Sequence, residues 1–295
     1  MAQQVPDSFL DVSRLLESSA PRPRGSWFWY IAGILLLILM LGSYFSSRYE
    51  QSQRLIEGLS MFLLIGMILA MWAMTWSAAR SVQREHAHLQ AIEELIQLRR
   101  WDQAAATLQS LLSRPARTPQ AHVQSLLFLA AVLARYHRFG DAIAVYDHIL
   151  STVQLDEDGT FGIKLARAMA QLRDDRLFDA DRAINELRRL CGADDSAALA
   201  LIEIYRDVKT GHPLEAADMF QKKHPVLTRQ LGHRMADALA LAARAHDLLG
   251  HADEAQALYG DATLLVAEPE LTRRYPELQP LAGKYPAASA PGEAA

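Results

Sequence analysis

Five alanines recur at nearly constant spacing along the chain, and each stands in the same local pattern. They are Ala104, Ala142, Ala180, Ala216 and Ala255, which lie 38, 38, 36 and 39 residues apart. A large apolar residue follows each alanine four positions later, and an acidic residue directly precedes four of the five. Self-similarity with a period of this length is typical of stacked repeats. The sequence therefore predicts an all-α domain of about five helix pairs.

The alanine is expected where the second helix of each pair crosses the first, because a methyl group lets two backbones approach closely. The acidic residue falls in the first turn of the second helix, where the helix dipole favours a carboxylate. Gly140, Gly211 and Gly250 lie in or beside the turns between helices, where left-handed backbone is expected. The large residues one turn after the alanines fill the space beside each crossing; they are Leu108, Tyr146, Ile184, Phe220 and Tyr259.

These columns resemble the tetratricopeptide repeat (TPR), which has a small residue in its first helix and an alanine followed by an aromatic residue in its second. The resemblance covers roughly residues 85–267. It implies an α-solenoid in which the first helix of each pair lines a groove for a partner. The period here is longer than the usual 34 residues, and the tryptophan of the family's first helix is absent.

The family's register, carried onto this sequence, predicts which side chains line that groove. A groove so apolar is expected to hold a helical or apolar segment of a protein partner. The alternative is that tighter packing buries these side chains within the stack. The last unit contributes Arg244 and Asp247, and the remaining predicted groove residues are Leu127, Ala131, Arg135, Leu165, Met169, Arg173, Leu201, Tyr205 and Lys209.

Two uncharged apolar windows precede the repeats, at residues 27–46 and 59–79. Each has about the twenty residues that a membrane helix requires, and aromatic residues stand near their ends, as in interfacial belts. The sequence predicts two transmembrane helices joined by a short loop over residues 47–58. The arginines near their ends predict that both termini and the repeats lie in the cytoplasm. The layout resembles bacterial membrane-tethered TPR proteins, and this resemblance implies a location in a bacterial-type inner (cytoplasmic) membrane.

Small residues share one face of the second window, at Gly66, Ala70, Ala73 and Ser77. Small residues at such spacing permit close helix packing in lipid. This face is expected to contact the first span, and the alternative is self-association between two copies of the chain.

The remaining segments are assigned by composition. Residues 1–26 form a tail and linker with a short amphipathic run that starts after Asp7 or Ser8, and residues 80–267 form the repeat domain. Three prolines preclude a long helix in residues 268–285, which are expected to cap the repeats. Residues 286–295 form a disordered tail.

The composition excludes several classes of function. A net charge of −4 argues against nucleic-acid binding, which usually needs a basic surface. A single cysteine excludes an internal disulfide framework, and no catalytic, metal or phosphate-loop motif occurs, so neither an enzyme nor a cofactor is expected. The hypothesis is a membrane-anchored scaffold or adaptor for protein–protein interaction. The alternative is an accessory subunit of a membrane enzyme or transporter complex, contacted through the hairpin.

Overall fold

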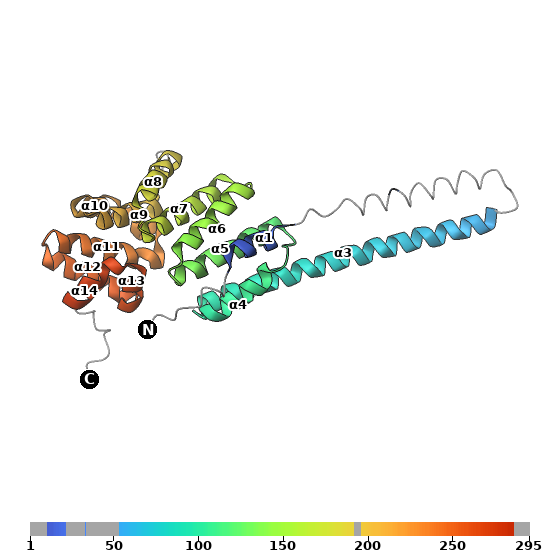
Figure 1. The fold of residues 1–295 in the computed structure, drawn as a ribbon, viewed down its shortest axis with the longest axis horizontal. Coiled ribbons are helices and arrows are strands. Elements are labelled where there is room, and N and C mark those ends of the chain that lie inside the picture. Colours follow the sequence, from blue (N-terminus) through green and yellow to red (C-terminus); the bar gives the residue numbers. More distant parts are fainter. Residues whose placement is uncertain (1–10, 22–32, 34–52, 192–195, 286–295) are drawn as a thin grey trace, which may run out of the picture. The chain divides into compact units, whose positions relative to one another are not determined.

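The computed structural model describes residues 11–21, 33, 53–191 and 196–285 of the chain. Every regular element in these ranges is a helix, and no strand occurs among them, which confirms the predicted all-α class (Figure 1). The chain divides into two compact units, Met1–Tyr136 and His137–Ala295.

The first unit begins with a short helix, α1 (Val12–Ser19), capped by the Asp11 carboxylate, which accepts the amide of Arg14. The sequence predicted a tail and linker here, but Val12 and Leu15 are buried and α1 packs on α4 (Trp101–Leu112). The Ser18 hydroxyl donates to the Leu112 carbonyl at 2.8 Å. The amphipathic run thus has a partner within its own unit.

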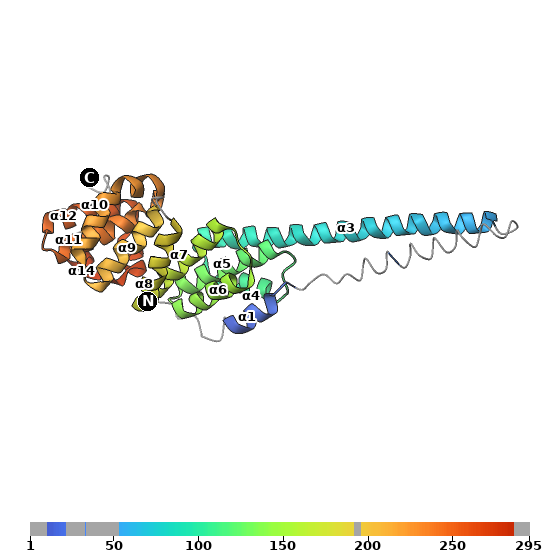
Figure 2. The same cartoon turned by 90° about the horizontal axis from the view of Figure 1, so that it is seen from above.

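Helix α3 (Gln53–Gln97) dominates the rest of this unit and packs against α4 and α5 (Pro119–Arg135) (Figure 2). It runs without a break for 45 residues. Residues from Gln53 onward are therefore helical where a loop was predicted over 47–58. The four small residues of the predicted packing face, Gly66, Ala70, Ala73 and Ser77, are solvent-exposed on α3.

In the described part of the chain, no helix has both the length and the apolarity needed to cross a bilayer. The predicted localisation, a two-span inner-membrane protein with cytoplasmic termini, is therefore wrong. Apart from Gly33, the first predicted span (27–46) lies outside the described residues. The second (59–79) is not a separate span with its own ends, because it is one part of α3, which continues through the charged residues Arg80, Arg84 and Glu85.

The second unit is a succession of helices in which neighbours along the chain pack on one another. Pairs form between α7 and α8, α9 and α10, and α11 and α12, and α9 also contacts both α7 and α11. The helices are α6 (Phe139–Thr152), α7 (Glu157–Arg173), α8 (Leu177–Cys191), α9 (Ala197–Thr210), α10 (Pro213–Gln230), η3 (Gly232–Arg234), α11 (Met235–Leu248), α12 (Ala252–Leu265), α13 (Glu268–Arg274), η4 (Pro276–Leu278) and α14 (Gln279–Lys284).

The repeated sequence columns lie in the cores of the two units. All five anchor alanines are fully buried, and the large residues four positions later are buried as well. Twelve positions before each alanine, on the preceding helix, stands another fully buried residue: Ile92, Ala130, Ala168, Ile204 or Ala243. The sequence pattern therefore identified buried positions on both helices of each pair.

A left-handed residue stands five positions before every anchor alanine. Gly211 and Gly250 have φ of 80° and 83°, and three non-glycine residues, Arg99, His137 and Asp175, have φ between 58° and 59°. At Gly211 the next amide, of His212, donates to the Asp207 carbonyl at 2.8 Å, which is the six-to-one bond of a helix-ending Schellman motif. Gly140, by contrast, lies inside α6.

Candidate functional site

Residues 268–285, here called the C-terminal segment, lie against α9 and α11. The segment comprises α13, η4, α14 and Tyr285, and η4 packs on α11. Its apolar side chains join the same core as α9 and α11, and burying five side chains of this size is strongly favourable. The five are Leu271, Tyr275, Leu278, Leu281 and Tyr285.

Tyr205 on α9 is the central contact of the segment. Its side chain is fully buried, and its hydroxyl donates to Glu277 Oε1 at 3.2 Å. Its ring meets Tyr275 edge to face, with centroids 5.0 Å apart, an arrangement that aromatic pairs favour. Burial, and next the Glu277 charge, raise the pKa of Tyr205 well above its ordinary value, so the hydroxyl stays protonated and donates.

Lys209 lies one turn after Tyr205 and forms an ion pair with Glu277, the acceptor of the Tyr205 hydroxyl. Its ammonium is 3.0 Å from Glu277 Oε1 and 2.9 Å from Asp175 Oδ1. Asp175 is the left-handed residue after α7. Lys209 therefore links α9, the end of α7 and the C-terminal segment.

Arg173 on α7 adds a cationic contact to the same tyrosine. Its guanidinium carbon lies 5.3 Å from the centre of the Tyr275 ring and 6.0 Å from the centre of the Phe139 ring. A guanidinium over an aromatic face is attracted by the ring quadrupole. Arg173 of α7 and Tyr205 of α9 therefore both contact the Tyr275 ring.

Asp237 on α11 is a buried carboxylate with partners on the segment. Arg274 Nη1 is 2.9 Å from Asp237 Oδ1, and the Tyr275 hydroxyl donates to Asp237 Oδ2 at 3.3 Å. Arg234 Nε stands 3.6 Å from the same Oδ2. Burial, and next the Asp237 charge, raise the pKa of Tyr275. The paired charges make burial of this carboxylate tolerable.

Asp247 repeats the arrangement at the other end of α11. Its Oδ1 accepts from Lys284 Nζ at 2.5 Å and from the Tyr285 hydroxyl at 3.2 Å, while Arg244 Nη1 is 2.6 Å from its Oδ2. Burial acts to raise the pKa of Asp247, but the hydrogen bonds from Lys284 and Tyr285 outweigh it and hold this pKa below its ordinary value.

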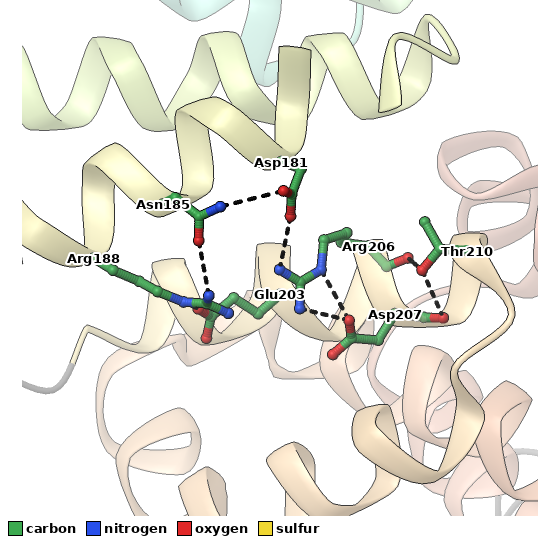
Figure 3. A network of polar contacts seen from close by, with 7 residues as sticks. All are labelled: Asp181, Asn185, Arg188, Glu203, Arg206, Asp207 and Thr210. Atoms are coloured by element: carbon green, nitrogen blue, oxygen red, sulfur yellow. Dashed lines mark hydrogen bonds and ion pairs between the residues drawn. The ribbon is translucent and has the colours of Figure 1, made fainter. Parts of the chain in front are cut away.

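The opposite side of α9 is held to α8 by a polar network (Figure 3). Arg206 donates to Asp207 Oδ1 from Nε at 2.9 Å and from Nη2 at 2.7 Å. Its Nη1 also lies 3.3 Å from Asp181 Oδ1 on α8. Arg188 on α8 pairs with the buried Glu203. Both buried carboxylates of α9 are therefore charge-compensated, and the network fixes the helix that presents Tyr205 and Lys209.

Within the second unit, the structure brings together several of the predicted groove residues. Tyr205, Lys209 and Arg173 contact the C-terminal segment, and Arg244 and Asp247 lie at its far end. Leu201 and Met169 are buried in the core, with Leu165 half-buried against it. The chain's own segment, which the sequence assigned to capping, therefore covers the face that was expected to hold a partner.

The predicted residues of the first unit form no comparable cluster in its described part. Leu127 is half-buried and Ala131 is exposed. The Arg135 guanidinium lies 5.2 Å from the centre of the Trp101 ring. These contacts tie α5 to α4.

Sequence reasoning missed Asp237 and Glu277, and it expected Tyr275 only as an apolar residue of the capping segment. A signal was present, since a basic residue, a tyrosine and a proline occur twice, as residues 274–276 and 284–286. The basic residue and tyrosine of each copy contact one aspartate of α11, and the aspartates share the ten-residue spacing of the copies.

Two of the cavities on the second unit are lined in part by residues of α11. One, of about 660 Å³, lies beside the segment and is lined by Val208, Lys209, Gly211, Arg244, Leu248, Pro276, Glu277, Gln279 and Pro280. The other, of about 740 Å³, lies between α10 and α12 and includes His224, His246 and His251. Over the described ranges, no group of three or more His, Cys, Asp or Glu residues is arranged to hold a metal ion.

Because the comparisons with known proteins give no match, a function for the chain has to be inferred from the geometry described above. No protein-family model, curated protein or solved structure matches the chain.

Proposed function

We propose that the chain is a non-catalytic scaffold or adaptor of the TPR type, which binds a segment of a protein partner on the face formed by α7, α9 and α11. The observation that carries the proposal is the contact of Tyr205 and Lys209 with Glu277 and Tyr275. Through these side-chain contacts the face already binds the chain's own C-terminal segment, which lies outside the repeats.

The repeated architecture supports an α-solenoid as the framework of this face. The anchor alanines and their partner columns are buried in every unit of the pattern, and a left-handed residue ends the first helix each time. A repeat unit buries its apolar side only against its neighbours. The helices of such stacks present a continuous surface, which other repeat proteins use for binding.

Site-specific photo-crosslinking tests the proposal. A benzophenone amino acid at Leu248, which is 45% exposed and borders the 660 Å³ cavity, is expected to trap one discrete partner in cells. Mass spectrometry identifies the adduct. The matched control is Leu264 on α12, 58% exposed and outside that cavity. Equal labelling from both positions, or no adduct from Leu248, contradicts the proposal.

A further inference from the structure

The contacts between α11 and the C-terminal segment are duplicated. The inner clip comprises Asp237, Arg274 and Tyr275, and the outer clip comprises Asp247, Lys284 and Tyr285. In each clip, one carboxylate accepts from a basic side chain and from the hydroxyl of the tyrosine that follows it. A carboxylate is acceptor-only, so each aspartate selects a segment that brings a cation and a hydroxyl donor together.

The two clips differ in burial. Tyr275 of the inner clip is fully buried between Tyr205 and Arg173. In the outer clip, the Lys284 side chain is 54% exposed, and of the apolar side chains from α14 onward only Leu281 and Tyr285 are buried among the described residues. Segments with few buried contacts open at a lower free energy than the whole fold. The outer clip therefore opens before the inner one.

Empty volume adjoins the outer clip. The 660 Å³ cavity is bounded on α11 by Leu248, which follows Asp247, and by Arg244, which pairs with it. On the segment it is bounded by Pro276, Gln279 and Pro280. Its walls are largely apolar, and its two cations, Lys209 and Arg244, are already paired with carboxylates. A segment bound at Asp247 has room here for neighbouring apolar side chains.

We propose that the outer clip is displaceable, and that a partner segment with a basic residue followed by tyrosine binds Asp247 in its place and extends into the adjoining cavity. The C-terminal segment is then a resident ligand that limits access to the site. The inner clip stays closed and keeps the second unit folded. This inference rests on the proposed adaptor function and names the chemistry of the partner.

A peptide from the chain itself is the probe. A fluorescent peptide of residues 279–286 is titrated into the full-length protein and binding is followed by anisotropy. The tethered clip competes at an effective concentration of the order of millimolar, so the variant Lys284→Ala/Tyr285→Ala is expected to bind the peptide at least about tenfold more tightly than wild type.

The matched control adds Asp247→Asn to the opened variant. Loss of the carboxylate is expected to weaken peptide binding by at least about tenfold, since a charge-assisted pair is replaced by a neutral one. A peptide with Lys284 and Tyr285 both replaced by alanine is expected not to bind. Equal binding by the wild-type and opened proteins, no binding by either, or binding indifferent to Asp247 overturns the inference.

Folding of the opened variant is checked by circular dichroism and thermal unfolding. A retained helical signal and a cooperative transition are expected, and an unfolded variant would show that the outer clip is a structural element and not a displaceable one. The crosslinking test separates the two proposals. An adduct at Leu248 without peptide binding leaves the adaptor function standing and refutes the motif, whereas peptide binding without an adduct does the reverse.

Discussion

His137 and Gly211 occupy the same place in their respective turns, each in left-handed backbone and five residues before a fully buried alanine. Gly211 ends α9 with φ of 80°, and a β-carbon there meets no atom within 4 Å. The conformation, and not space, therefore makes glycine the favoured residue at this position.

Replacing Gly211 with alanine tests that reading. A non-glycine residue in left-handed backbone costs about 1–2 kcal/mol, so Gly211→Ala is expected to lower the free energy of unfolding by about 1 kcal/mol, measured by urea denaturation. The control is Gly260→Ala inside α12, where the added methyl also meets nothing within 4 Å. Because alanine is favoured over glycine within a helix by about 0.8–1 kcal/mol, that variant is expected to be more stable. Destabilisation of both variants would contradict the argument.

The converse substitution is available at His137. This residue is exposed and has φ of 59°. His137→Gly is expected to raise the unfolding free energy by up to about 1 kcal/mol, because the left-handed strain is relieved, less the loss of the ring contact with Phe139. The midpoint of urea unfolding should rise with an unchanged slope. A lower midpoint would show that the ring contact outweighs the strain.

Two buried tyrosines provide a second contrast. The Tyr205 hydroxyl donates to Glu277, whereas the Tyr259 hydroxyl is buried and has no hydrogen-bond partner among the described residues. Tyr205→Phe is expected to cost about 0.5–1.5 kcal/mol of unfolding free energy. Tyr259→Phe removes an unsatisfied buried group and is expected to be neutral or stabilising. Calorimetric unfolding of the two variants measures the difference, and equal losses would refute the contrast.

The low pKa of Asp247 predicts an acid dependence of stability. The unfolded aspartate has a pKa of about 3.9, and the folded one titrates lower. A depressed folded pKa contributes stability that is complete above the unfolded value and is lost as pH falls through the folded value. The difference in unfolding free energy between wild type and Asp247→Asn should thus be constant above about pH 5 and shrink below pH 4. A difference that does not change with pH would contradict the ion-pair assignment.

Raised tyrosine pKa values predict the opposite dependence in alkali. Burial first of all raises the pKa of Tyr146, Tyr205 and Tyr275 and raises that of Tyr259 to about 12. A raised folded pKa contributes stability that is complete below the unfolded value of about 10 and is lost as pH rises through the folded value. Unfolding free energy should fall above pH 10, and less steeply in Tyr205→Phe. An equal slope would show that Tyr205 ionises freely in the folded state.

The repeat pattern made the helix pairs predictable because alanine and its large neighbour report directly on a close crossing. It could not locate every turn. Left-handed backbone at Gly211 and Gly250 is signalled by residue type, but a histidine or aspartate at the same place gives a much weaker signal than glycine. Register alone identifies His137 and Asp175, since both stand five residues before an anchor alanine.

The surface that the C-terminal segment covers could not be predicted from the sequence. Pro269, Pro276 and Pro280 predict breaks in a helix, but they do not indicate which surface the resulting short helices cover. The docking depends on pairs separated by 37 and 38 residues, such as Arg274 with Asp237 and Tyr285 with Asp247. The span prediction failed because, in the described part of the chain, no helix is long and apolar enough to cross a bilayer.

The separation between α11 and the segment that covers it also matters while the chain is being made. Asp237 and Asp247 are synthesised 37 residues before their basic partners. Because translation proceeds at about 5–20 residues per second, each aspartate of α11 is made about two to seven seconds before the basic residue of the segment that pairs with it.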